Sequence, residues 1–145
     1  MPRTTVPLQE PALKPTARET VARGMRILLV EDEPLTAEVL ARALSRDGHI
    51  VDVARDGLQA MRQLRDRLPN LVVLDMMLPA IPGADVVRKL REDGHLDLPI
   101  IVVSGSPRRH ADLSDRELTP GTWLEKPVKP RHLVEVVRAF TQQDA

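Results

Sequence analysis

Cysteine is absent from the 145-residue chain, and aromatic residues are nearly absent, with one tryptophan, one phenylalanine and no tyrosine. The first absence excludes disulfides, thiolate metal sites and cysteine nucleophiles. It also agrees with a reducing cytoplasm, where we expect the protein to be located. Because only Trp123 and Phe140 are aromatic, aliphatic residues and methionine must form any hydrophobic core.

Net charge and long apolar runs are lacking as well. The chain has 21 Lys plus Arg and 21 Asp plus Glu, so no electrostatic feature favours nucleic acid or a membrane as its main partner. The longest apolar runs, residues 27–30 and 99–103, are far shorter than the roughly 20 residues that span a bilayer. No apolar segment of the kind found in a secretory signal follows the basic residues of the N-terminus.

The first 24 residues contain four prolines and few large apolar side chains. Such a segment cannot bury enough apolar surface to offset its chain entropy. We therefore predict a disordered leader over residues 1–24 and one folded domain over residues 25–145. Two alternatives stay open, namely that the leader is a docking arm, or that translation starts at Met25.

From Met25 onward, short apolar runs alternate with segments of helical periodicity. The runs predict strands at 26–30, 50–54, 71–74, 100–103 and 122–125. The periodic segments predict helices over about 35–46, 58–68, 84–92, 108–118 and 133–140. This alternation is typical of an α/β fold in which helices cover both faces of a parallel sheet. In such sheets, ligands bind beyond the carboxyl ends of the strands.

Polar residues follow the predicted strands at these carboxyl ends. Glu-Asp-Glu at 31–33 follows the first strand, Asp75 the third, Ser104 the fourth and Lys126 the fifth. Converging carboxylates need a cation to stay ionised, and oxygen ligands without His or Cys suit Mg²⁺. The lysine and the hydroxyl would contact an anion beside the metal. The pattern therefore favours a site where a carboxylate accepts a phosphoryl group.

Three motifs resemble the receiver domain of bacterial response regulators: Val-Glu-Asp-Glu-Pro at 30–34, Leu-Asp-Met-Met-Leu-Pro at 74–79 and Glu-Lys-Pro at 125–127. The similarity extends from Met25 to about Gln142. It implies a flavodoxin-like fold of five strand–helix units, a doubly wound parallel sheet with strand order 2-1-3-4-5. It also implies a signalling switch in a two-component phosphorelay rather than a conventional enzyme.

The resemblance implies that Asp75 is the phosphoacceptor and takes its phosphoryl group from the phosphohistidine of a sensor histidine kinase or phosphotransfer protein. It implies that Asp32 ligates Mg²⁺ directly and Glu31 ligates it through water. Asp75 itself and the backbone carbonyl of Met77 complete the protein's ligands. The side chain of Met77 cannot orient an attacking water, so we expect slow self-catalysed dephosphorylation.

The resemblance assigns the remaining groups to phosphoryl binding and switching. Lys126 pairs with the phosphoryl oxygens and Ser104 donates a hydrogen bond to them, while Pro127 is a candidate for a cis peptide bond. Movement of Ser104 and an inward turn of Trp123 alter the face made by the fourth helix, fifth strand and fifth helix, where a downstream protein binds. Ordinary packing of Trp123 is an equally open interpretation.

Several positions depart from the family pattern or match no function. Gly105 follows the switch hydroxyl where alanine is usual, and Pro82 stands where a capping side chain is common. Four histidines show no ligand spacing, and we expect them on the surface: His49, His95, His110 and His132.

Two other functions compete with the phosphoryl switch. One is a degenerate receiver that acts as a fixed protein-interaction module without phosphorylation. The other is a phosphatase with an aspartyl nucleophile, which is disfavoured because Met77 stands where that class has a second acid. The sequence contains no DNA-binding helix-turn-helix, and it leaves open whether the domain stands alone or belongs to a longer protein.

Overall fold

The computed structural model describes residues 24–142, so the predicted leader lies outside the described residues apart from Gly24. The strands are β1 (Arg26–Val30), β2 (Ile50–Ala54), β3 (Leu71–Asp75), β4 (Ile100–Ser104) and β5 (Gly121–Glu125). The helices are α2 (Pro34–Arg46), α3 (Gly57–Asp66), α4 (Gly83–Glu92), the 3₁₀ turn η1 (Arg108–His110), α5 (Asp115–Leu118) and α6 (Pro130–Gln142).

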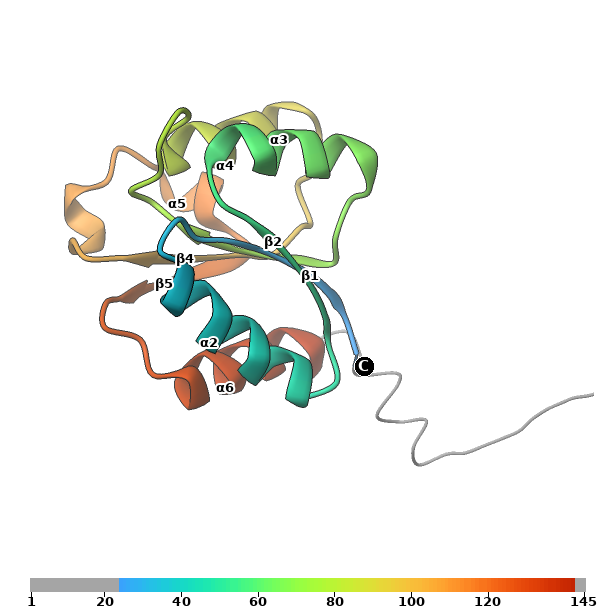
Figure 1. Ribbon diagram of the computed structural model, residues 1–145. Helices are drawn as coiled ribbons and strands as arrows, with labels where there is room; N and C mark the ends of the chain where they lie inside the picture. The colour runs from blue at the N-terminus through green and yellow to red at the C-terminus, as the bar shows by residue number, and fades with distance from the viewer. Residues whose placement is uncertain (1–23, 143–145) are drawn as a thin grey trace, which may run out of the picture.

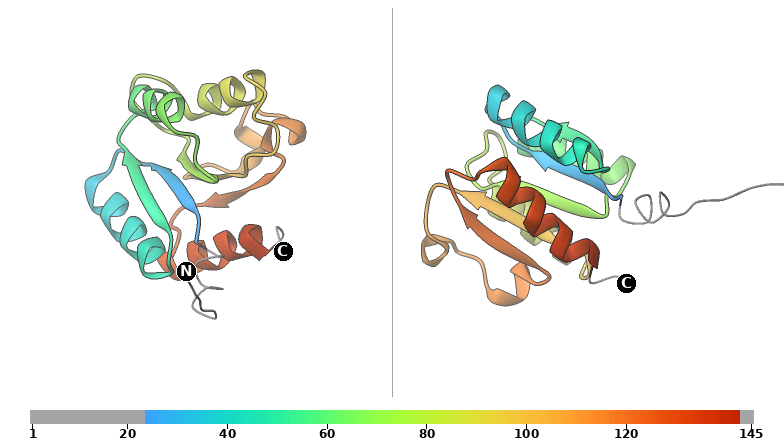
Figure 2. Two further views of the ribbon diagram at one scale, coloured as in Figure 1. Left: turned by 90° about the vertical axis from the view of Figure 1, so that its right-hand side faces the viewer. Right: turned by 90° about the horizontal axis from the view of Figure 1, so that it is seen from below.

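The five strands form one parallel sheet in the order β2-β1-β3-β4-β5, which confirms the predicted topology. Helices α2 and α6 cover one face, and α3, α4 and α5 cover the other (Figures 1 and 2). Strands β3 and β4 are buried at every position, because they lie inside the sheet and both faces are covered. Among the described residues, none of the helices has the length and apolarity that a membrane span requires.

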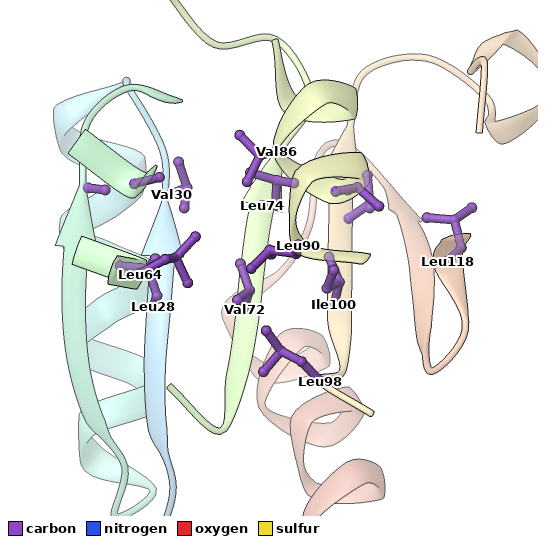
Figure 3. Close-up of a cluster of buried hydrophobic side chains, with 14 of the residues drawn as sticks. Leu28, Val30, Leu64, Val72, Leu74, Val86, Leu90, Leu98, Ile100 and Leu118 are labelled. Atoms are coloured by element: carbon purple, nitrogen blue, oxygen red, sulfur yellow. The ribbon is translucent and has the colours of Figure 1, made fainter. Parts of the chain in front are cut away.

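Side chains of the central strands alternate between two separate cores. Leu28, Val72 and Ile100 point toward α3 and α4, where they pack with Leu64, Val86 and Leu90 (Figure 3). Their neighbours Ile27, Leu71 and Ile101 pack on the opposite face with residues of α2 and α6, including Leu44 and Leu133. The continuous aliphatic runs of the sequence are therefore explained by strands that supply alternate residues to two layers.

Two predicted helices differ in detail from the observed ones. The helical spacing of Leu35, Val39, Leu40 and Leu44 predicts that these residues share the buried face of the first helix. Helix α2 leaves Leu35 and Val39 exposed and buries Ala37 together with Leu40 and Leu44. Helix α3 ends at Asp66, so Leu68 lies beyond it.

The prediction of one continuous helix over 108–118 is wrong. This segment forms η1 and the four-residue α5, and Ala111 between them has extended backbone angles. The segment has too few apolar residues to bury a full helix face, and a new helix begins at Asp115 with Ser114 as its N-cap. There the Ser114 hydroxyl accepts from the Glu117 N–H, and the Glu117 carboxylate accepts from the Ser114 N–H.

His49 is buried, which corrects the expectation that all four histidines lie on the surface. Its Nδ1 accepts a hydrogen bond from the Met25 N–H at 3.1 Å, where the chain enters β1. Burial lowers the pKa of His49, and the charge of nearby Asp47 opposes that shift only in part. Because protonation would also remove the acceptor for Met25, the folded domain needs His49 to be neutral.

Acidification should therefore destabilise the domain through His49. The unfolded chain has a histidine of ordinary pKa, about 6.5, while the pKa in the folded domain is lower. Between these two values the unfolded chain binds more protons, so the free energy of unfolding falls as the pH falls through that window. In His49→Asn the amide oxygen can accept the same hydrogen bond, and urea titrations should show a flatter profile below pH 6.5. An unchanged profile would contradict this.

Candidate functional site

The carboxyl ends of β1, β3, β4 and β5 meet at one edge of the sheet. Strand β1 lies between β2 and β3, so the order in which the strands are added to the sheet changes direction beside β1. Open parallel sheets form a crevice at such a point. Val30 pairs with Leu74, and Ser104 pairs with Glu125. The residues that follow these strands are thereby brought together from segments far apart in the sequence.

Three carboxylates form the centre of the site. Oxygen atoms of Glu31, Asp32 and Asp75 lie within 4.8 Å of one another. Glu31 and Asp75 are only 2% and 3% exposed, whereas Asp32 is open to solvent. Burial raises the pKa of Glu31, and the charge of Asp75 raises it further. Two nearly buried acids beside an exposed one are the kind of oxygen donors that a hard divalent cation prefers.

Lys126 supplies a cation facing these acids. Its Nζ lies 3.0 Å from Asp75 Oδ2 and 3.6 Å from Glu31 Oε1. Burial alone would lower the pKa of Lys126, but the hydrogen bond and charge of Asp75 outweigh it, and the pKa is raised. The ammonium therefore stays charged. The Lys126 N–H donates to the Ser104 carbonyl at 2.7 Å, and the peptide bond to Pro127 is cis.

The loop between β3 and α4 shapes the wall of the site beside Asp75. The Met77 N–H donates to Asp75 Oδ1 at 2.9 Å, while the Met77 side chain is 74% exposed. Pro82 precedes α4 and supplies no side-chain cap. Gly57, the first residue of α3, packs so closely on this loop that a Cβ would lie 2.4 Å from the Ile81 carbonyl oxygen. The loop is therefore held by a hydrogen bond to the Asp75 carboxylate at its start and by the close backbone contact with Gly57 near its end.

Ser104 and Trp123 are linked through a residue that the sequence did not indicate. The buried Ser104 Oγ accepts a hydrogen bond from the Ser106 N–H at 3.1 Å, and the Ser106 carbonyl accepts one from Trp123 Nε1 at 3.1 Å. Ser106 contributes only its backbone, so no side-chain pattern could have revealed it. Gly105 lies between Ser104 and Ser106, and a Cβ added there would meet no atom within 4 Å.

These groups can together bind a divalent cation and an anion beside it. The carboxylates provide oxygen ligands, the Lys126 ammonium provides positive charge, and the Ser104 hydroxyl provides a donor. The side-chain groups that the sequence predicted for metal and anion binding are thus gathered at one end of the sheet.

The sequence model for the family "Response regulator receiver domain" matches residues 27–138. The chain is 39% identical over 114 residues to the DNA-binding response regulator MtrA of Mycolicibacterium smegmatis, a match covering 79% of this chain and 49% of that protein. It is 34% identical over 119 residues to the response regulator MprA of Mycobacterium avium, covering 82% of this chain and 52% of that protein. The chain thus spans about half the length of these curated relatives.

Solved structures show the same similarity. A sensor protein from Polaromonas sp. JS666 matches with a TM-score of 0.73 and 32% identity, over 83% of this chain and 98% of that chain. The response regulator TrrA from Thermotoga maritima, solved in complex with Mg(2+)-BeF, matches with a TM-score of 0.69 and 30% identity, over 79% of this chain and 96% of that chain.

Proposed function

The chain belongs to the response regulator receiver domain family of two-component systems, and on this premise we propose that it is a switch that Asp75 controls by accepting a phosphoryl group. The observation that carries the proposal is the contact of Lys126 with the buried Asp75 carboxylate, beside two further acids. This arrangement offers a nucleophilic oxygen together with groups that neutralise an incoming phosphoryl group.

We assign magnesium binding to the carboxylates of Glu31, Asp32 and Asp75 and to the backbone carbonyl of Met77. The mutual distances of the three carboxylates and their oxygen chemistry fit this ion. When bound, Mg²⁺ neutralises charge on the phosphoryl oxygens during transfer. TrrA, whose structure was solved with Mg(2+)-BeF, supports the assignment by similarity.

In the proposed reaction, an Asp75 carboxylate oxygen attacks the phosphorus of a phosphohistidine. An O–P bond forms and the P–N bond breaks, so the histidine of the donor leaves with the electron pair. Lys126 then pairs with the phosphoryl oxygens, and Ser104 donates a hydrogen bond to one of them. The donor is a sensor histidine kinase or a phosphotransfer protein, and we place the reaction in the cytoplasm.

Signal output follows from movement of Ser104 and Trp123, which alters the surface formed by α5, β5 and α6 for a downstream protein. MtrA is named as a DNA-binding response regulator, but the match covers about half of it, and we propose no nucleic-acid or membrane contact for the described residues. Nothing in the site or the comparisons favours the alternative of a fixed module that is never phosphorylated.

Incubation with acetyl phosphate and Mg²⁺ tests the proposed function. Intact-mass analysis should show the gain of one phosphoryl group, and chelation of Mg²⁺ should prevent it. The gain should vanish in Asp75→Asn, because an amide cannot form the acyl phosphate. Asp66→Asn removes an exposed acid outside the site and serves as the matched control. Equal labelling of Asp75→Asn would reject Asp75 as the acceptor.

A further inference from the structure

We propose that Arg91 on α4 is a positioning residue that holds the start of β5 and thereby couples Trp123 to events at Ser104. The inference rests on the proposed function, since the event at Ser104 is the arrival of a phosphoryl group on Asp75. It concerns a residue in the last turn of α4, and no contact between Arg91 and the site is required.

Arg91 donates hydrogen bonds to four backbone carbonyls. Its Nη1 lies 2.7 Å from the His95 carbonyl oxygen and 2.8 Å from that of Leu98, both in the loop after α4. Its Nε lies 2.8 Å from the Glu117 carbonyl oxygen in α5, and its Nη2 lies 3.1 Å from that of Pro120, which precedes β5. The planar guanidinium has enough donors to join these three segments at once.

The segment that Arg91 holds has little support of its own. Helix α5 has four residues, which is far below the roughly 12 residues at which an isolated helix becomes marginally stable. Arg88, one turn before Arg91, pairs with the Glu117 carboxylate at 3.4 Å, and Leu118 is buried in the core beneath. The position of α5 is therefore set by α4.

From Pro120 the restraint passes directly into β5. The Pro120 carbonyl accepts from the Ile100 N–H at 3.1 Å as well as from Arg91, so it is fixed by both β4 and α4. Three residues later, Trp123 pairs with Val102 in the sheet. A short strand tied at its first residues moves as one unit, so the anchoring of Pro120 also anchors the backbone of Trp123.

Trp123 then connects this anchored strand to the site. Its indole N–H holds the Ser106 carbonyl, and the Ser106 N–H is bonded to Ser104 Oγ. If the hydroxyl turns toward a phosphoryl group, Ser106 loses one of these two bonds and the loop moves relative to β5. When Arg91 fixes β5, the loop moves relative to the strand and the surroundings of the Trp123 indole change. When β5 is not fixed, the strand follows the loop and the surroundings of the indole stay the same.

Tryptophan fluorescence tests the coupling, because Trp123 is the only tryptophan. The probe is beryllofluoride with Mg²⁺, a phosphoryl analogue. In Arg91→Met, which keeps an apolar stem but has no donors, the fluorescence response should fall about fivefold, and labelling of Asp75 by acetyl phosphate should stay within about twofold of wild type. Arg91→Lys should restore part of the response, since an ammonium can bind some of the carbonyls.

Lys89→Met is the matched control, because Lys89 lies on the same helix and makes an exposed ion pair with Asp93; its response should equal that of wild type. A full response in Arg91→Met with normal labelling would overturn the inference. Should that variant fold poorly, Arg91→Gln, whose shorter amide cannot reach all four carbonyls, takes its place, and a full response in Arg91→Gln with normal labelling would overturn the inference equally. Wild-type protein that is labelled without a fluorescence change would also overturn the coupling, whereas a lack of labelling would overturn the proposed function instead.

Discussion

Lys126→Met should slow labelling of Asp75 by acetyl phosphate at least about a hundredfold, the usual cost of losing a charged group that stabilises a transition state. The same substitution should strengthen Mg²⁺ binding about tenfold, because it removes a cation that competes for the carboxylates. The opposite directions follow from one contact, since the Lys126 ammonium lies between Asp75 and Glu31. In the proposed reaction, the ammonium neutralises the acids before transfer and the phosphoryl oxygens afterwards.

Intact mass over time measures the labelling, and titration of Trp123 fluorescence with Mg²⁺ measures the metal affinity. Lys129→Met removes the same charge three residues later from an exposed side chain and should leave both quantities near their wild-type values. If Lys126→Met weakens Mg²⁺ binding, the ammonium is not a competitor of the metal, and our account of the electrostatics of the site is wrong.

Gly121→Ala should lower the free energy of unfolding by about 3 kcal/mol, the sum of backbone strain and overpacking at one position. Gly121 opens β5 with a φ of +154°, and an added Cβ would lie 2.1 Å from the Ile100 carbonyl oxygen and 2.6 Å from that of Leu118. Both contacts are with backbone, so no side chain can move aside. A loss of this size is a large part of the stability of an ordinary domain.

Gly105→Ala is the control for Gly121→Ala, because an added Cβ at Gly105 meets nothing within 4 Å. Urea titration should show a shift below about 0.5 kcal/mol for the control and a clear loss for Gly121→Ala. Similar midpoints for the two variants would show that the start of β5 can relax, contrary to the close packing between Ile100 and Leu118.

The strands and the acids that follow them could be predicted because the relevant signals are local, whereas the strand order 2-1-3-4-5 was implied by the resemblance to the receiver family. A continuous run such as 71–74 identifies a central strand, and an acid placed directly after it, such as Asp75, must lie at the strand's carboxyl end. The parallel topology then brings Asp75, Glu31 and Lys126 together. No further knowledge of side-chain packing was needed for that part of the site.

The remaining features depend on contacts between segments distant in the sequence. Nothing in the sequence distinguishes His49 from a surface histidine. Its burial follows from the pairing of β2 with β1, which places it beside the Met25 N–H. Ser106 acts through its backbone, and Arg91 binds carbonyls that belong to no motif. The break between η1 and α5 depends on how little apolar surface the segment can bury, which propensity alone does not measure.

The separation of the interior into two cores has a consequence for how the protein can change over evolutionary time. Neighbouring residues of one strand, such as Leu71 and Val72, belong to different cores, and substitutions without shared contacts act nearly independently. Substitutions in the core beneath α3, α4 and α5 can therefore accumulate with little effect on the core beneath α2 and α6, so the two halves of the interior can vary separately.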